Sequence, residues 1–211
     1  MSIHPVPVQL PPLLEGIDKL MRPLAQQKGL GFAMELTNDL PSWVEADGTR
    51  LRQIFLNLVT NAIKFSDAGT VAVKVGRDEK AGPDQPNTYP LRLDVVDEGI
   101  GMDHATLTKL FERFAQGDAS TSRRFGGTGL GLEISRNLAR RMGGDIEAHS
   151  VLGQGSTFTV TLPLTLAAPP KLPVSLGQPH TPAASSAELA GLDILVADDQ
   201  MVNRKYMGAL L

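Results

Sequence analysis

The sequence predicts a two-layer α/β sandwich, in which a mixed, mostly antiparallel sheet of about five strands is backed by three main helices. Three segments carry apolar residues every three to four positions, as amphipathic helices do. Between them lie short segments of alternating apolar and polar residues, bounded by Gly, Pro and Asp, as in β-strands. A chain of 211 residues with 42% hydrophobic residues can bury one substantial core.

The first half of the chain holds two of these helices. Pro11 and Pro12 fit the first turn of a helix that ends near Gly29, because an N–H is not needed there. Residues 32–36 and 43–46 are expected to form short strands. Asp47 is a candidate N-cap for the second helix. Its apolar face is formed by Leu51, Ile54 or Phe55, Leu58, Ala62 and Phe65.

The second half is expected to contain two hairpins separated by a lid. Residues 70–77 and 91–97 alternate in polarity and are expected to pair antiparallel. Residues 102–128 form a long glycine-bearing loop with a short helix near 105–113, a length typical of a functional loop. A third helix over 129–142 is followed by a hairpin of strands 145–150 and 156–164.

Composition indicates one globular domain with a tail. Residues 1–164 form the predicted domain, residues 165–190 a linker rich in Ala, Pro and Ser, and residues 191–211 the start of a further domain. A net charge of −3 argues against nucleic acid as a partner, and the lack of cysteine fits a reducing compartment. No stretch approaches the length of a membrane span, so we expect a cytoplasmic chain without membrane contact, and any inner-membrane anchor of a parent protein would lie outside this chain. We expect the chain by itself to be monomeric.

Three polar motifs stand out. Asn57, Asn61 and Lys64 share one face of the second helix, where amide oxygens can coordinate Mg²⁺ and a lysine can attract phosphates. Taken alone, this set is better explained as the solvated face of an amphipathic helix. Asp97 ends a strand and is followed by Gly99 and Gly101, so a fixed carboxylate could accept a hydrogen bond from an exocyclic amine, or the segment could be an ordinary turn.

The third motif is a glycine string that opens the third helix. Its residues are Gly127, Thr128, Gly129, Leu130 and Gly131. Backbone N–H groups at a helix N-terminus favour an anion, so this is a candidate phosphate cradle. It matches neither the P-loop pattern nor the dinucleotide-binding pattern.

The order of the motifs resembles one family. N-x-x-x-N-x-x-K, D-E-G-I-G, F-E-R-F, G-T-G-L-G-L and G-Q-G-S-T-F follow one another as the N, G1, F, G2 and G3 boxes do in sensor histidine kinases. That family shares an ATPase superfamily with gyrase, the chaperone Hsp90 and MutL. The resemblance covers residues 11–164 and implies a Bergerat-type fold with an ATP lid.

The resemblance also implies roles for individual residues. Asn61 would ligate Mg²⁺, Asn57 and Lys64 would act beside the metal and phosphates as catalytic residues, and Asp97 would recognise adenine. Gly99 and Gly101 would shape the adenine pocket, and Thr157 would lie near the base. The glycine string from Gly127 to Gly131 would border the triphosphate. Further candidates are Arg123 and Arg124 for the phosphates, with Phe111 and Phe114 anchoring the lid.

The expected activity is transfer of the γ-phosphoryl group of Mg-ATP to a histidine on another domain. ATP-hydrolysing relatives carry a glutamate where this chain has Asn57, and an amide is a poor general base, so hydrolysis should be slow. In the family, the phosphate-accepting histidine is followed closely by an acidic residue. None of the four histidines of this chain has that sequence context; they are His4, His104, His149 and His180. The partner would therefore be a histidine-bearing dimerisation domain preceding residue 1, in a homodimeric parent protein. A non-catalytic nucleotide-binding module and a gyrase-like machine are the alternatives.

The tail resembles the first strand of a response-regulator receiver domain, whose acidic pair would be Asp198 and Asp199. Together with the preceding domain this implies a hybrid kinase, with a receiver domain or response regulator as a second partner. The receiver's phosphate-accepting aspartate is absent from the tail.

Overall fold

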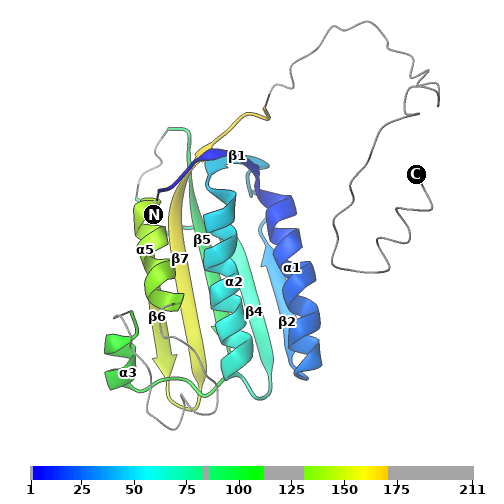
Figure 1. The fold of residues 1–211 in the computed structure, drawn as a ribbon, viewed down its shortest axis with the longest axis vertical. Helices are drawn as coiled ribbons and strands as arrows, with labels where there is room; N and C mark the ends of the chain where they lie inside the picture. Colours follow the sequence, from blue (N-terminus) through cyan, green and yellow to red (C-terminus); the bar gives the residue numbers. More distant parts are fainter. Residues whose placement is uncertain (1, 83–85, 112–130, 171–211) are drawn as a thin grey trace, which may run out of the picture. The chain divides into compact units, whose positions relative to one another are not determined.

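A computed structural model describes residues 2–82, 86–111 and 131–170 of the chain. Within these residues three long helices cover one face of a seven-stranded sheet, and the opposite face has no helix on it (Figure 1). The predicted two-layer α/β sandwich is confirmed.

The elements follow the predicted order closely. The helices are α1 (Leu10–Gln27), α2 (Gly48–Phe65), α3 (His104–Lys109) and α5 (Gly131–Arg141). The strands are β1 (Val6–Gln9), β2 (Gly31–Leu36), β3 (Trp43–Ala46), β4 (Thr70–Arg77), β5 (Thr88–Asp97), β6 (Asp145–Val151) and β7 (Gly155–Leu166). The short lid helix ends at Lys109, earlier than the expected residue 113.

The sheet runs in the order β1-β3-β7-β5-β4-β2, and β6 pairs with β7 beside this path. Both predicted hairpins, β4 with β5 and β6 with β7, are antiparallel, and β2 with β4 is a parallel pair. The sheet has seven strands, so the expected number of about five was too low. The proline-punctuated N-terminal segment forms an edge strand on β3, where Pro7 has no need of a ladder partner on its outer side.

The core lies between the helices and one face of the sheet. In β5 the side chains of Leu91, Leu93 and Val95 are buried against the helix layer, and the intervening Arg92 and Asp94 lie on the other face. Asp97 continues the buried set, so strand alternation directs a carboxylate toward the helices. The fold thus creates a charged position at the end of an apolar strand.

The start of α2 is capped as predicted. Asp47 Oδ1 accepts a hydrogen bond from the backbone N–H of Arg50 at 3.1 Å, and Oδ2 accepts one from the N–H of His4 at 3.1 Å. At the other end, Lys28 Nζ donates to the carbonyls of Ile63 at 2.8 Å and Lys64 at 2.7 Å. The helix that carries the Asn57 motif is therefore capped by its own N-cap residue at the start and by the side chain of Lys28 from another segment at the end.

Candidate functional site

The polar stripe of α2 occupies the expected helix face. Asn57, Asn61 and Lys64 are partly exposed, whereas Leu58 and Ala62 beside them are buried in the core. The ammonium group of Lys64 lies 5.0 Å from the centroid of the Phe65 ring. The helix thus offers two amide oxygens and a cation along one side, a donor set that suits Mg²⁺ and phosphate oxygens.

Asn57 also contacts the helix that the glycine string opens. Its Nδ2 donates a hydrogen bond to Ser135 Oγ at 2.9 Å. A Cβ built on Gly131 would lie 2.5 Å from Asn57 Oδ1, so a larger residue at this position would require the Asn57 side chain to shift. The structure therefore brings Asn57 and Gly131, two of the predicted site residues, together.

Asp97 forms a second part of the site, near the C-terminal end of α2. Its side chain is 5% exposed, and Oδ1 accepts a hydrogen bond from the N–H of Gly99 at 2.9 Å. Burial raises the pKa of the Asp97 carboxyl above its ordinary value, although hydrogen bonds from the N–H groups of Gly99 and Ser156 act in the opposite direction. A buried carboxylate can discriminate strongly for a donor such as an amine.

Glycines hold the chain after Asp97 against its neighbours. A Cβ on Gly99 would overlap the carbonyl of Phe65, and the N–H of Ile100 donates to that same carbonyl at 3.1 Å. Gly101 has φ of +61°, and its Cβ would overlap the carbonyl of Val151. Both predicted glycines are thus required for close approach, because no larger residue fits between α2, the Asp97 turn and the β6–β7 hairpin.

Two serines that the sequence did not single out, Ser150 and Ser156, lie next to Asp97. Ser156 faces Asp97 in the register of β5 and β7, and its Oγ lies 3.1 Å from Ser150 Oγ. Ser150 in turn accepts a hydrogen bond from the N–H of Met102 at 2.8 Å. The buried alternation of Phe158, Val160 and Leu162 is the signal that could have identified Ser156.

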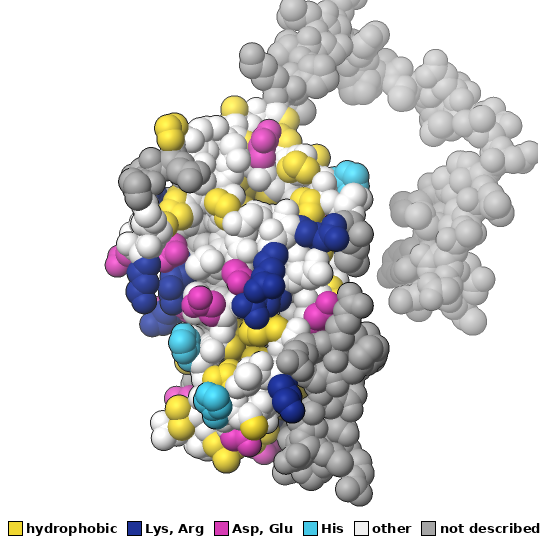
Figure 2. All heavy atoms as spheres, turned by 90° about the vertical axis from the view of Figure 1, so that its left-hand side faces the viewer, with side chains coloured by type: hydrophobic (Ala, Val, Ile, Leu, Met, Phe, Trp, Pro, Cys, Tyr) yellow, Lys and Arg dark blue, Asp and Glu magenta, His cyan; other side chains and the backbone are white. Residues whose placement is uncertain are grey.

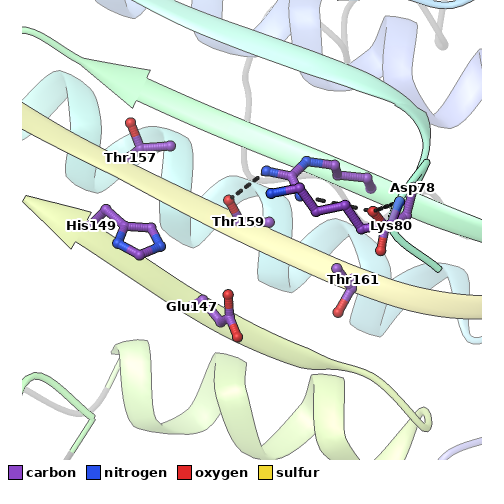
Figure 3. Close-up of a pocket in the computed structure, with 8 residues that line it drawn as sticks. Asp78, Lys80, Glu147, His149, Thr157, Thr159 and Thr161 are labelled. Atoms are coloured by element: carbon purple, nitrogen blue, oxygen red, sulfur yellow. Dashed lines mark hydrogen bonds and ion pairs between the residues drawn. The ribbon is translucent and has the colours of Figure 1, made fainter. Parts of the chain in front are cut away.

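Thr157 does not lie where the resemblance implied. It pairs with Val96 and His149 in the sheet register and lines a hollow on the face that the helices do not cover, together with Thr159 and Glu147 (Figure 3). Successive strand side chains point to opposite faces, so Thr157 is directed away from the Asp97 side. Of the two neighbours, Ser156 pairs with Asp97 and Thr157 lies on the opposite face of the sheet, whereas the resemblance implied that Thr157 would share the side of Asp97.

The helix α5 is fixed to β6 by charge. Arg136 Nε lies 2.8 Å and Arg140 Nε 3.1 Å from Asp145 Oδ1. Burial raises the pKa of the Asp145 carboxyl, but hydrogen bonds from the two guanidinium groups outweigh it and hold the pKa well below its ordinary value. The Arg136 guanidinium also lies 4.4 Å from the Phe111 ring centroid, which supports Phe111 as an anchor of the lid.

Basic and acidic side chains stand next to each other on the molecular face drawn in Figure 2. This mixed pattern differs from the broad positive field expected of a nucleic-acid-binding surface. Among residues 2–82, 86–111 and 131–170, no helix is both long and apolar enough to cross a membrane.

Several predicted site residues lie outside the described part of the chain. They are Arg123, Arg124, Gly127, Thr128, Gly129 and Leu130, together with Phe114 of the lid and Asp198 and Asp199 of the tail.

The structure combines an α/β sandwich with three candidate site features, namely the asparagines of α2, the buried Asp97, and Gly131 at the first described residue of α5. Residues 46–166 match the family model described as histidine kinase-, DNA gyrase B-, and HSP90-like ATPase. The chain belongs to this ATPase family.

Relatives support the kinase branch. The chain is 38% identical over 200 residues to the sensor histidine kinase AruS of Pseudomonas aeruginosa, covering 94% of this chain and 18% of that protein. It is 44% identical over 157 residues to the aerobic respiration control sensor protein ArcB of Escherichia coli, covering 74% of this chain and 19% of ArcB. The chain thus spans about a fifth of the length of these relatives.

Solved structures agree with the fold. Full-length ShkA, crystallised in complex with AMPPNP, matches with a TM-score of 0.66 and 34% identity, over 81% of this chain and 33% of that one. The catalytic domain of the histidine kinase ThkA matches with a TM-score of 0.59 and 25% identity, over 77% of this chain and 98% of that one.

Proposed function

We propose that this chain contains the catalytic ATP-binding domain of a sensor histidine kinase, which binds Mg-ATP and presents its γ-phosphoryl group to a histidine on a separate domain. The observation that carries the proposal is Asp97, a 5%-exposed carboxylate held by the N–H of Gly99 beside glycines that leave no room for a side chain. This arrangement suits the exocyclic amine and flat ring of adenine.

The phosphates would extend from Asp97 along α2 toward Gly131. The carbonyl of Phe65 accepts from Ile100 in the Asp97 turn, and Asn57 contacts Gly131, so α2 joins the two parts of the site. Asn61 and Lys64 lie between these two contacts along the helix. Bound Mg²⁺ would neutralise phosphate charge, and the amide oxygen of Asn61 suits it as a ligand.

Asn57 accounts for the expected preference for transfer over hydrolysis. Its amide is neutral, and its nitrogen is already engaged by Ser135 Oγ at 2.9 Å. Such a group cannot take a proton from an attacking water. The domain would hold ATP until an acceptor histidine arrives, and positioning supplies most of the catalysis.

The partners are part of the same proposal. The acceptor would be a histidine on a separate dimerisation domain. The described histidines of this chain are dispersed: His4 lies in the N-terminal segment, His104 at the start of α3, and His149 on the outer face of β6. Residues 191–211, after a linker over 165–190, would begin a receiver domain that takes the phosphoryl group onward.

Calorimetry with ATP, with and without Mg²⁺, tests the binding step. We expect binding by the chain, loss of binding in Asp97→Ala, and unchanged binding in the control Asp94→Ala, since Asp94 lies on the same strand but the opposite face. Absence of binding by the folded wild-type chain would refute the proposal.

Transfer is tested with labelled ATP and a separate histidine-bearing helical hairpin from a sensor kinase. Label should appear on the hairpin and not on this chain when it is incubated alone. A chain that binds ATP but never labels the hairpin would be a nucleotide-binding module without kinase activity.

A further inference from the structure

Ser135 is a buried hydroxyl group to which the sequence motifs assign no role. It lies in α5, is 1% exposed, and accepts a hydrogen bond from Asn57 Nδ2 at 2.9 Å. The two residues are 78 positions apart in the chain. This is a direct side-chain link between the helix of the asparagine motif and the helix that the glycine string opens.

The same amide has a second contact one turn earlier on α5. A Cβ built on Gly131 would lie 2.5 Å from Asn57 Oδ1, 3.2 Å from its Cγ and 3.3 Å from its Nδ2, so this glycine lies close to the amide. Residues four apart share a helix face, so Gly131 and Ser135 meet Asn57 from the same side. The amide is thus held at its nitrogen by a hydrogen bond and lies close to Gly131.

We propose that Ser135 is a positioning residue, which acts through Asn57 to fix the spacing between α2 and the N-terminus of α5 at the phosphate and metal end of the site. This inference rests on the proposed function. An asparagine side chain has two rotatable bonds, so without the hydroxyl its amide is free to turn and its nitrogen loses a partner. The effect should fall on the Mg²⁺-dependent part of nucleotide binding, because Asp97 and its glycines contact neither residue in the described hydrogen bonds.

A double-mutant cycle tests the link on the chain as it stands. Calorimetry measures ATP affinity with and without Mg²⁺ for wild type, Ser135→Ala, Asn57→Ala and the double variant. The loss of one ordinary hydrogen bond should weaken Mg-ATP binding by about three- to tenfold in Ser135→Ala, and by less than about twofold when Asn57 is already alanine. Affinity without Mg²⁺ should change little.

Thr159→Val is the matched control. Thr159 is also buried, and its hydroxyl donates to Asp94 Oδ1 at 2.6 Å, but on the sheet face away from Asp97. This variant should lose stability and keep its affinity for Mg-ATP. Should Ser135→Ala not fold, Ser135→Cys keeps the volume and replaces the hydroxyl by a weak acceptor, which gives the same comparison.

The outcomes separate the two proposals. A folded wild-type chain that does not bind ATP refutes the proposed function, and this inference with it. Binding by wild type, together with either no loss in Ser135→Ala or an equal loss in both Asn57 backgrounds, refutes the positioning role alone.

Discussion

Replacing Asp97 by asparagine should separate nucleotide binding from stability. Oδ1 of Asp97 already accepts the N–H of Gly99, and an amide oxygen can keep that bond. The other carboxylate oxygen becomes an NH₂ group, which would face the amine of adenine with a second donor. The substitution Asp97→Asn thus changes little in shape but reverses the hydrogen-bonding character of the site.

The expected size of the effect follows from burial. A hydrogen bond to a charged group contributes about 1.5–3 kcal/mol, and leaving a buried donor unpaired costs about 1–3 kcal/mol more. Since about 1.4 kcal/mol is tenfold in affinity, Asp97→Asn should weaken ATP binding by about a hundredfold or more. GTP should gain relative to ATP, because the guanine oxygen is an acceptor for the new NH₂ group.

The free energy of unfolding should change much less than the affinity for ATP. Burial raises the pKa of Asp97, so the folded state favours its protonated form, and the associated stability is present at low pH and lost as pH rises through the folded-state pKa. A neutral asparagine removes this loss at pH 7. Its single side-chain oxygen, however, must accept the N–H groups of both Gly99 and Ser156. The two effects oppose each other, so the melting temperature of Asp97→Asn should stay close to that of wild type.

Titration calorimetry with ATP and GTP, combined with thermal melts at pH 7, measures both effects. Affinity for ATP within about threefold of wild type would refute the assignment of Asp97 as the base reader. A large drop in melting temperature alongside weak binding would show instead that the carboxylate is structural.

Three further predictions concern the frame around the site. Gly101→Ala should lower both the melting temperature and ATP affinity, because Gly101 has a φ of +61° and an added Cβ would overlap the carbonyl of Val151. Gly29→Ala is the control, since Gly29 has a φ of +77° but no atom within 4 Å of an added Cβ. It should lower the free energy of unfolding only by the backbone cost of about 1–2 kcal/mol. Lys28→Met should destabilise the chain by about 1 kcal/mol in denaturant melts, since two carbonyls at the end of α2 lose their donor, and equal stability would contradict that role. Asp145→Asn should lower the melting temperature at pH 7. Because the pKa of Asp145 is depressed in the folded state, the carboxylate stabilises the fold above its unfolded pKa of about 4, and this stabilisation is lost as pH falls below that value. The difference in melting temperature between the variant and wild type should therefore narrow in acid.

Local pattern was enough to predict most elements and two parts of the site. Helical spacing places Asn57, Asn61 and Lys64 on one face of α2 whatever the helix packs against, and the structure has them there. Likewise Asp97 follows an apolar strand, and the alternation in that strand directs it into the core. Periods of 3.6 and two residues are properties of the backbone, so they can be read from neighbouring residues alone.

Pairing between distant segments was decided only by the tertiary structure. Strand β1 exists because residues 6–9 find an edge on β3. The prolines of this segment suggest an extended chain, but no local pattern indicates which strand it pairs with. The link from Asn57 to Ser135 likewise depends on how α2 and α5 pack.

Ser156 and Thr157 show most clearly what local sequence could predict and what depended on tertiary pairing. The motif around them could be recognised in the sequence, but a shift of one residue along a strand exchanges the two faces of a sheet. The register of β7 against β5 places Ser156 opposite Asp97 and directs Thr157 to the uncovered face. The sequence by itself determined which residue types meet at this edge, and the strand register, which depends on packing across the whole sheet, determined which of them face the site.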